Sequence, residues 1–389
     1  MTRSLASPPR FPYRILGLMS YADHFATWLE IDLSAIRGNV RRCREITGVN
    51  VMAVVKANGY GHGIAPVTLA AIEAGATWCG VARLEEGLEL RQAGIEAPVL
   101  VLGSTPPGML SAAVAGGISM AVWDVEQVRA AEAAAGANGG RARLHLKVDT
   151  GMTRLGAHPG EALGIARALS ASKALVFEGT FTHFARADEP DSPTTEIQER
   201  RFREVIAAIE GAGLRPGVVH ASNSAAAIYR PSARFDLVRV GVGMYGLHPS
   251  ERCPLPEGFR PALAWKAQLT QVRSVEPGAG VSYGHVYIAQ KRERVGVVPV
   301  GYADGMRRVE GNRVIVGGRL VPVVGRVCMD QCMVLLDEAP QAKAGDEVVI
   351  LGEQQGAGQS AEDIARHWGT INYEVTTGLS ARVPRVYSG

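Results

Sequence analysis

The chain has 389 residues, of which 47% are hydrophobic and 20% are charged. This composition excludes a disordered chain and a collagen-like one. The net charge of +3, from 41 basic and 38 acidic side chains, gives no reason to expect nucleic acid or an anionic membrane as a partner. At roughly 150 residues a domain, the length predicts two or three domains, or an α/β barrel with one extra domain.

The 5 cysteines are scattered along the chain and form no CxxC pair. Their odd number argues against a disulfide framework and for a reducing, cytoplasmic compartment. Cys328 and Cys332 lie close together in the sequence. That spacing alone is weak support for a metal site, and no metal is expected.

Two segments bear on targeting. Near the N-terminus, the apolar piece Ile15–Met19 is too short for a signal peptide. We interpret residues 1–26 as a leader extension of unknown role or a mis-assigned start. Residues 97–123 carry no charge and are long enough to span a membrane. The run Gly103–Gly108, rich in glycine and proline, interrupts them, so we predict two buried strands with a helix between and no membrane partner.

From Val51 onward, short apolar runs alternate with alanine-rich helical stretches. The predicted strands are Val51–Val55, Thr77–Ala82, Pro98–Leu102, Ile118–Val122, Ala142–Val148, Leu175–His183, Gly217–Ala221 and Phe235–Val240. Helices are expected near residues 63–75, 84–93, 106–116, 124–136, 158–171, 193–213 and 224–230. This alternation indicates a parallel sheet covered on both faces, and eight such units favour a (β/α)₈ barrel over residues 27–261. A doubly wound open sheet is the alternative.

After the proline-rich stretch Cys253–Pro261 the pattern changes to short β-type runs punctuated by glycine and proline. The predicted strands are Ala267–Val275, Arg294–Pro299, Arg313–Val316, Leu320–Val327, Cys332–Leu336 and Glu347–Leu351, and a helix is expected at Ala361–Trp368. Residues 262–389 are therefore predicted to form a second, mostly β domain.

Polar residues concentrate just past the predicted barrel strands, where the active sites of barrels lie. Lys56 directly follows Val51–Val55. Desolvation would lower the pKa of this lysine and favour a neutral amine that can form a Schiff base. The alternative is a surface lysine on a glycine turn.

Barrels often bind phosphate with the loops after strands seven and eight. Ser224 places a hydroxyl at a predicted helix start, and Gly241 and Val242 offer backbone N–H groups. A phosphate-bearing ligand is therefore expected there, facing Lys56 across the barrel mouth.

Two literal motif matches are rejected. Gly241–Gly246 matches GxGxxG, but no helix is predicted to follow it, as a dinucleotide fingerprint requires. Gly280–Gly284 matches GxSxG around Ser282, but a strand is predicted where a nucleophile elbow needs a helix.

An ordered set of motifs resembles the alanine racemase family from Trp28 to Arg385. Its members are Ala53–Gly63, Asp149–Met152, Thr182–Ala185, Asn223-Ser224, Arg239–Gly241, Ser282–Gly284, Gly301–Gly305, Val327–Gln331 and Ile371–Glu374. The resemblance implies a barrel that binds pyridoxal 5′-phosphate (PLP), followed by a β domain. It departs from the family at Met306, where an aromatic residue is common, and at Thr153, where glycine is common.

The resemblance also implies roles for individual residues around the cofactor. Lys56 would hold PLP, Arg239 would face its pyridine nitrogen, and His183 would support Arg239. Because arginine does not readily give up its proton, that nitrogen would stay unprotonated and the cofactor would be a weaker electron sink. The remaining implied cofactor contacts, chiefly to the phosphate, are Tyr60, Asn223, Ser224, Gly241, Val242 and Tyr373.

Racemisation needs a base on each face of the substrate α-carbon. By the same resemblance, Lys56 would serve the D-face and Tyr283 the L-face. Arg154 would bind the substrate carboxylate, and Lys147 matches a lysine that is carbamylated in some members. The family forms a homodimer with shared sites, in which the second-domain residues Tyr302, Met329 and Asp330 would narrow the entrance. Ordinary packing of the β domain is the alternative for these three.

These points predict an enzyme that interconverts L- and D-alanine and supplies D-alanine for peptidoglycan. Three alternatives remain at this stage. The first is a PLP-dependent decarboxylase of the same architecture, and the second is a non-catalytic PLP carrier built from a lone barrel. The third is a serine hydrolase that uses Ser282.

Overall fold

The computed structural model describes residues 24–389, so nearly all of the expected leader lies outside the described residues. The described chain divides into two compact units, which are treated separately below. The first unit is Ser34–Arg260, and the second joins residues 24–33 to Pro261–Gly389. Within the described part of the chain, no helix is long and apolar enough to cross a membrane.

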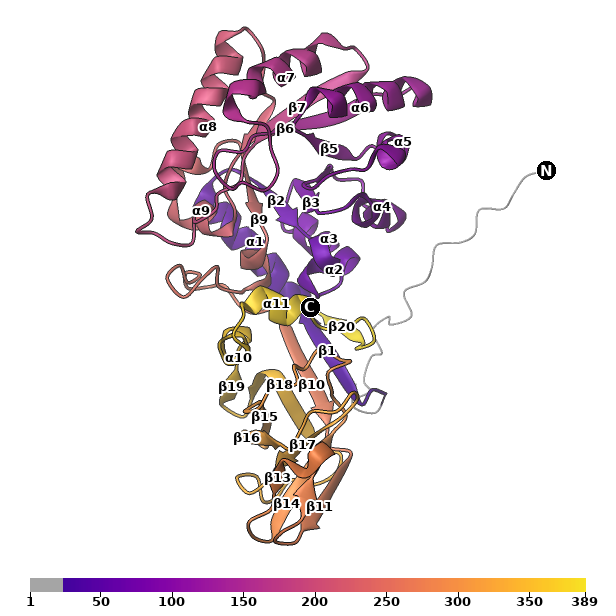
Figure 1. The fold of residues 1–389 in the computed structure, drawn as a ribbon, viewed down its shortest axis with the longest axis vertical. Helices are drawn as coiled ribbons and strands as arrows, with labels where there is room; N and C mark the ends of the chain where they lie inside the picture. The colour runs from indigo at the N-terminus through magenta and orange to yellow at the C-terminus, as the bar shows by residue number, and fades with distance from the viewer. Residues whose placement is uncertain (1–23) are drawn as a thin grey trace, which may run out of the picture. The chain divides into compact units, whose positions relative to one another are not determined.

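The first unit is built on eight parallel strands (Figure 1). They are β2 (Asn50–Val54), β3 (Trp78–Val81), β4 (Val99–Val101), β5 (Ser119–Val122), β6 (Ala142–Lys147), β7 (Leu175–Phe181), β8 (Val218–His220) and β9 (Leu237–Val240). Each strand from β2 to β8 pairs with the next along the chain, and β9 returns to pair with β2. Backbone hydrogen bonds from Asp236 to Val219 and from Arg239 to Ser222, both 3.0 Å, join the remaining edges. The barrel is therefore confirmed over the open sheet.

Helices follow the strands and cover the outside of the barrel (Figure 1). They are α1 (Leu33–Thr47), α2 (Lys56–Tyr60), α3 (Ile64–Glu73), α4 (Leu84–Gln92), α5 (Leu110–Ala115), α6 (Val125–Asn138), α7 (Pro159–Ala171), α8 (Thr194–Gly211) and α9 (Ser224–Tyr229). The uncharged segment 97–123 forms β4, α5 and β5, as predicted. Its apolar side chains are buried in this unit because a parallel sheet is covered on both faces.

The barrel has a closely packed apolar interior. Five buried side chains form one cluster, contributed by Met52, Leu100, Ala121, Phe181 and Leu237. They come from five different strands, so the cluster ties opposite sides of the barrel together. Polar side chains that lie inside the barrel must therefore be held by specific partners.

The second unit is mostly β, as predicted. Its main strands are β1 (Thr27–Asp32), β10 (Leu263–Gln268), β11 (Gln271–Val275), β14 (Glu293–Val298), β15 (Arg313–Val316), β16 (Arg319–Val324), β17 (Cys332–Leu335), β18 (Glu347–Gln354) and β20 (Arg385–Ser388). These pair in the order β11-β14-β17-β16-β15-β18-β10-β1-β20, and β19 (Ala357–Gln359) pairs with β18. A two-stranded ribbon, β12 (Gly280–Val281) and β13 (Tyr287–Ile288), and two helices, α10 (Ala361–Trp368) and α11 (Asn372–Thr377), complete the unit.

The structure corrects two details of the predicted organisation. The barrel domain was expected to begin at residue 27, but Thr27–Asp32 is a strand of the second unit, antiparallel to β10 and parallel to β20. The expected single strand Ala267–Val275 is two strands. The chain turns at Leu269 and Thr270, whose N–H groups bond to Asp346 and Val297, and so passes from the β18 side of the sheet to the β14 edge.

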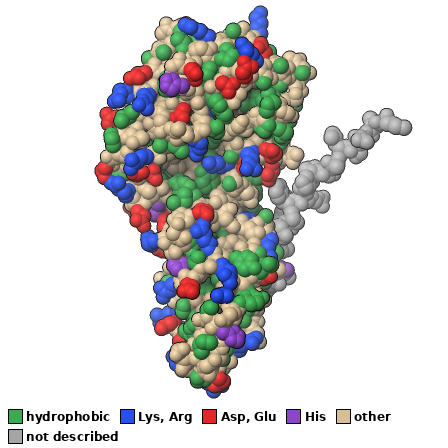
Figure 2. Space-filling model, viewed as in Figure 1, with side chains coloured by type: hydrophobic (Ala, Val, Ile, Leu, Met, Phe, Trp, Pro, Cys, Tyr) green, Lys and Arg blue, Asp and Glu red, His purple; other side chains and the backbone are tan. Residues whose placement is uncertain are grey.

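The surface carries both signs of charge in close mixture. In Figure 2, Lys and Arg side chains alternate with Asp and Glu over the visible face of both units. This distribution fits the near-neutral net charge of the sequence. It offers no continuous basic field on that face for a nucleic acid backbone.

Candidate active site

Lys56 begins a left-handed turn at the carboxyl end of β2. The three residues after it have φ/ψ near +50°: 53/53 at Ala57, 52/48 at Asn58 and 60/46 at Gly59, and Tyr60 follows with φ of 52°. A left-handed conformation costs a non-glycine residue about 1–2 kcal/mol. Such local strain persists only where surrounding contacts hold it, and it is concentrated at functional sites.

Two side chains hold this turn, one from α4 and one from the turn itself. The Glu86 carboxylate accepts the N–H of Ala57 at 2.6 Å and, with its other oxygen, the N–H of Ala82 at 2.8 Å. The Asn58 side chain accepts the N–H of Ile64 at 3.0 Å, which fixes the start of α3. The sequence motif signalled a special turn through its glycines, but its left-handed course and the role of Glu86 were not foreseen.

The lysines at the carboxyl ends of β2 and β6 have lowered pKa values. Burial and the positive charge of Arg154 lower the pKa of Lys56, which Glu86 offsets in part. Burial, together with Arg154, Arg239 and Lys56, lowers the pKa of Lys147 to about 8. The structure thus places both lysines in one cationic, partly desolvated neighbourhood in which neutral amines are favoured.

Arg154 lies on a loop held by Asp149. One carboxylate oxygen of Asp149 accepts the N–H groups of Gly151, Met152 and Thr153 at 2.9, 2.9 and 3.0 Å. Thr153 has a φ of 56°, so it occupies a left-handed position that suits glycine better. Within residues 24–389 the exposed Arg154 side chain has no hydrogen bond or ion pair, so its guanidinium is available to a carboxylate.

The loops after β8 and β9 form a polar cradle. Ser224 is buried at the start of α9, and its hydroxyl oxygen accepts the N–H groups of Gly241 at 3.0 Å and Gly243 at 3.3 Å. This leaves the Ser224 O–H to donate. Asn223 caps α9 by accepting the N–H of Ala226 at 3.0 Å, and Val242 begins the short turn after β9.

Tyr60 packs against this cradle. Its ring stacks on Tyr245 with centroids 4.9 Å apart, and burial raises the pKa of Tyr60 to about 12, so its hydroxyl keeps its proton. A methyl group at Gly241 would lie 2.6 Å from the Tyr60 hydroxyl oxygen. The glycine is therefore required for the close approach of the two segments.

Arg239 is buried inside the barrel near its carboxyl end. Its guanidinium donates to Nδ1 of His220 at 2.9 Å, to Nδ1 of His183 at 3.1 Å, and to the carbonyls of Thr182 and Ala221, both at 2.7 Å. Burial lowers the pKa of Arg239 to about 9, and burial together with Arg239 holds the pKa of His183 well below its usual value. His183 is thus neutral and accepts from Arg239.

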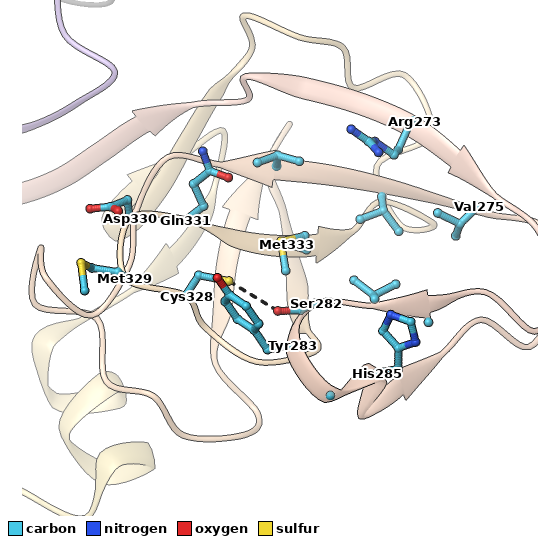
Figure 3. Close-up of a pocket in the computed structure, with 15 residues that line it drawn as sticks. Arg273, Val275, Ser282, Tyr283, His285, Cys328, Met329, Asp330, Gln331 and Met333 are labelled. Carbon is cyan, nitrogen blue, oxygen red and sulfur yellow. Dashed lines mark hydrogen bonds between the residues drawn. The ribbon is translucent and has the colours of Figure 1, made fainter.

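Tyr283 lies in the second unit, beside a cavity of about 780 Å³ (Figure 3). Its side chain is 67% exposed and stands next to Ser282 and Cys328. The Ser282 hydroxyl donates to the carbonyl of Arg326 at 2.6 Å and lies 3.5 Å from the Cys328 sulfur. In the part of the chain that the structure describes, the Ser282 hydroxyl bonds to no histidine side chain, so the arrangement lacks the base that a serine nucleophile needs.

Tyr302, Met329 and Asp330 come together on adjoining loops of the second unit. The N–H of Tyr302 bonds to the carbonyl of Cys328, and the N–H of Ala303 to that of Met329, both at 3.0 Å. Arg382 donates at 2.7 Å to buried Asp304 and at 2.7 Å to Asp330, so one arginine clamps both loops. Tyr302 and Met329 are exposed, at 45% and 53%. Ordinary core packing therefore does not explain them.

Tyr373 is the remaining expected cofactor contact. It lies at the start of α11 in the second unit, where its carbonyl accepts the hydroxyl of Thr377 at 2.7 Å. The expected residues are thus divided between the units. The barrel holds Lys56, Tyr60, Lys147, Arg154, His183, Asn223, Ser224, Arg239, Gly241 and Val242, and the second unit holds Tyr283, Tyr302, Met329, Asp330 and Tyr373.

A lysine amine, a buried arginine and a hydroxyl cradle at the carboxyl ends of barrel strands define an enzyme built from a barrel and a β domain. The family model "Alanine racemase, N-terminal domain" matches residues 31–249, and "Alanine racemase, C-terminal domain" matches residues 262–387. The chain belongs to the alanine racemase family.

Individual relatives agree with this assignment. An alanine racemase of Symbiobacterium thermophilum is 45% identical over 366 residues, which are 93% of this chain and 97% of that relative. The solved alanine racemase of Streptomyces lavendulae has a TM-score of 0.89 and 42% identity, over 94% of this chain and 97% of the other. The alanine racemase of Bacillus anthracis, solved with bound L-Ala-P, has a TM-score of 0.89 and 39% identity, over 94% and 96%.

Proposed function

We propose that this protein is a PLP-dependent racemase that interconverts L- and D-alanine. The observation that carries the proposal is Lys56, a partly buried lysine with a lowered pKa at the mouth of a barrel. A lysine in such a place is suited to bind a carbonyl and to exchange protons near neutral pH.

The barrel residues fit the cofactor by the chemistry of their donors. Lys56 offers an amine to the aldehyde, and the O–H of Ser224 and the hydroxyl of Tyr60 offer donors to the phosphate. Because the N–H of Gly241 already bonds to Ser224, its part is to hold that hydroxyl in place. When bound, PLP would supply the electron sink that acidifies the α-proton of the amino acid.

Arg239 would hold the ring nitrogen without protonating it. Its hydrogen-bond partners among the described residues are two neutral histidines and two carbonyls, and none is a carboxylate. An arginine at the ring nitrogen would restrain the electron sink, which favours return of a proton to the α-carbon over transamination.

Two bases of this chain would then move the proton. Nζ of Lys56 would exchange it on the D-face, and Oη of Tyr283 would exchange it on the L-face. Arg154 would bind the substrate carboxylate, because its guanidinium has no partner within the described residues. The loop held by Asp149 would keep that arginine in place.

Lys147 is suited to carbamylation. With its pKa lowered to about 8, roughly a tenth of its amine is neutral at pH 7 and can add CO₂, releasing one proton. The product would be an anion among the cations Arg154, Arg239 and Lys56, which would steady Arg154.

The exposure of three second-unit side chains supports a site that is shared between protomers. These are Tyr283, Tyr302 and Met329. Large side chains of this kind, grouped and open to solvent, are typical of surfaces that another chain covers. We infer a homodimer in which these residues, with Asp330 and Tyr373, complete the barrel site of the partner protomer. A narrow entrance made by Tyr302 and Met329 would select a small side chain such as that of alanine.

We further propose a cytoplasmic enzyme that supplies D-alanine for peptidoglycan, as expected from the cysteines and from the family. The proposal is tested by incubating the purified protein with PLP and L-alanine and measuring all products. A racemase yields D-alanine and releases no CO₂, a decarboxylase releases CO₂, and a carrier protein gives no turnover. Labelling of Ser282 by a serine-reactive phosphonate, with loss of activity, would instead support the hydrolase.

A further inference from the structure

A buried chain of polar side chains leads from Arg239 to the opposite end of the barrel. Nη1 of Arg239 lies 2.9 Å from Nδ1 of His220 on β8, and Nε2 of His220 lies 3.1 Å from Nδ1 of His145 on β6. Nε2 of His145 then faces the Glu178 carboxylate on β7 at 3.4 Å. Both histidines are fully buried.

The direction of every link follows from the chemistry of arginine. Arginine only donates, so Nδ1 of His220 must accept, and its ring proton must be on Nε2. That N–H points to Nδ1 of His145, which must also accept, so the proton of His145 is on Nε2 and faces Glu178. Burial lowers the pKa of both rings, to well below the usual value for His220, so both are neutral. The last link, at 3.4 Å, is a close electrostatic contact and not a well-aligned hydrogen bond.

Glu178 is held as a carboxylate. Burial alone would raise its pKa, but the contact with His145 and the hydrogen bonds from Ser119 and Arg143 outweigh burial and lower it to about 2. Ser119 donates to one oxygen, and Nε of Arg143 donates to the other at 2.7 Å. The Arg143 side chain is 47% exposed, so the chain ends at the surface.

The backbone is shaped to admit this chain. The register between β6 and β7 shifts at His145, which pairs with Gly179 and leaves Glu178 as the extra residue of the ladder. Such irregularities re-aim side chains next to functional sites. A methyl group at Gly179 would lie 2.4 Å from Nδ1 of His145, so only glycine leaves room for the ring. His220 is stacked on Phe181 with centroids 4.8 Å apart and planes 3° apart.

We propose that Glu178 is a positioning residue that acts on Arg239 through His145 and His220. Arg239 is a buried cation with no carboxylate among its partners, which is costly unless charge is supplied from elsewhere. Glu178 supplies that charge from two imidazoles away and makes His220 a better acceptor, as a carboxylate does for a metal-bound histidine. The orientation of the Arg239 guanidinium toward the proposed ring nitrogen would depend on it. This inference rests on the proposed function.

The test measures kcat, KM and the pH dependence of kcat/KM for the PLP-loaded enzyme with alanine. The pH dependence of the absorbance of bound PLP, recorded without substrate, should shift in the same direction as the activity profile of each variant. Glu178→Gln removes the distant anion, so kcat/KM should fall roughly tenfold. The alkaline limb of the kcat/KM profile should also move to lower pH. Burial has already lowered the pKa of Arg239 to about 9, and without Glu178 its cationic form loses further support. Arg143→Gln removes the cation bonded to Glu178, so the limb should move to higher pH. General damage to the fold would not shift the alkaline limb in opposite directions for Glu178→Gln and Arg143→Gln.

Other titratable groups near Arg239 are His220, His183 and Lys147, which also lies over the Phe181 ring, with Lys56 further along the mouth. If the charge of Glu178 acted directly through space, its removal would shift the pKa values of several of these groups together. His145→Phe separates an effect through space from one through the histidines. It interrupts the connection between Glu178 and Arg239 but keeps the charges of both. We expect kcat/KM of this variant to fall about as far as that of Glu178→Gln.

Glu199→Gln is the matched control. Glu199, on the outer helix α8, is a similarly buried carboxylate that bonds to Arg203 and Arg230. Its removal should lower the melting temperature and leave the pH profile unchanged. The proposal is overturned if the alkaline limb of the kcat/KM profile stays in place in Glu178→Gln and Arg143→Gln, or shifts in the same direction in both. A wild-type kcat/KM for His145→Phe would also overturn it. If Glu178→Gln does not fold, an unshifted limb in Arg143→Gln overturns it alone. Failure of the wild-type enzyme to racemise alanine would instead refute the proposed function.

Discussion

Gly241 and Tyr60 meet so closely that a methyl group on the glycine would lie 2.6 Å from the tyrosine hydroxyl oxygen. The contact joins the loop after β9, the last strand of the barrel, to the left-handed turn after β2, the first. Since these two strands are neighbours, the contact sets the spacing between the lysine turn and the hydroxyl cradle.

Gly241→Ala should therefore weaken cofactor binding more than it destabilises the fold. The added methyl group must displace the Tyr60 hydroxyl, and we expect the affinity for PLP to fall about tenfold, equivalent to the loss of one hydrogen bond to a charged group. Titration of the apoenzyme with PLP measures this. Tyr60→Phe serves as the comparison, since it removes the hydroxyl without the clash. An unchanged affinity in both variants would contradict the assignment of this cradle.

Lys56→Ala should abolish racemisation and the absorbance of the lysine-bound cofactor. The remaining phosphate contacts would still allow weak binding of PLP. Reduction of the wild-type holoenzyme with borohydride, followed by peptide mapping, should place the cofactor on Lys56. Label on Lys147 in place of Lys56 would show that the two lysines with lowered pKa values have been assigned in the wrong order.

Tyr283→Phe should retain the cofactor and the fold, because the exposed hydroxyl has no packing role within the second unit. Removal of one general base is expected to lower kcat by about 10²–10⁴-fold. Exchange of the α-proton of D-alanine with solvent, which Lys56 would catalyse, should be less affected than that of L-alanine. Equal losses for the two enantiomers would contradict the two-base assignment.

Activity should depend on CO₂ through Lys147. Its lowered pKa of about 8 means that the reactive neutral amine increases as the pH rises through this value. We expect enzyme stripped of CO₂ at acidic pH to lose activity and to recover when bicarbonate restores the CO₂. At equal concentrations of dissolved CO₂, the recovery should be faster near pH 9 than near pH 7, because more of the amine is neutral. Lys147→Ala should be less active and indifferent to bicarbonate. A wild-type enzyme that is equally indifferent would show that this lysine stays an amine.

Asp149→Ala should raise KM for alanine with a smaller effect on kcat. The carboxylate holds three N–H groups of the loop that carries Arg154, so its loss loosens the arginine rather than removing it. A rise of roughly tenfold corresponds to one lost hydrogen bond to a charged group. Asp149→Asn keeps an acceptor oxygen and should recover part of the loss. Wild-type KM in the alanine variant would count against this role.

The barrel could be predicted because each of its strands is a short apolar run covered on both faces, and the helices between them repeat regularly. The assignment of Thr27–Asp32 to the second unit could not be predicted from the sequence. Its partners, β10 and β20, lie more than 200 residues away in the sequence, and nothing local distinguishes a strand of one unit from a strand of the other.

In the candidate site, too, some features could be predicted from the sequence and others could not. Lys56 and Ser224 follow apolar strands, and Arg239 lies near the end of one. These positions are visible in the sequence. The left-handed turn from Ala57 to Tyr60 depends on distant contacts such as Glu86, which no local pattern reveals. Glu178 did leave a signal, as the one carboxylate inside the apolar run Leu175–His183. Its connection to Arg239 depends on the shifted register of two strands, and only the structure gives that.

The measurement that tests the central claim most directly is a chiral separation of alanine after incubation with the PLP-loaded enzyme. It should be started once from pure L-alanine and once from pure D-alanine. Because enantiomers have equal free energies in water, a racemase must bring both reactions to the same equal mixture. Convergence on equal amounts from both sides is the predicted result. No conversion from either side, with the cofactor absorbance intact, would contradict the assignment of alanine racemisation to this protein.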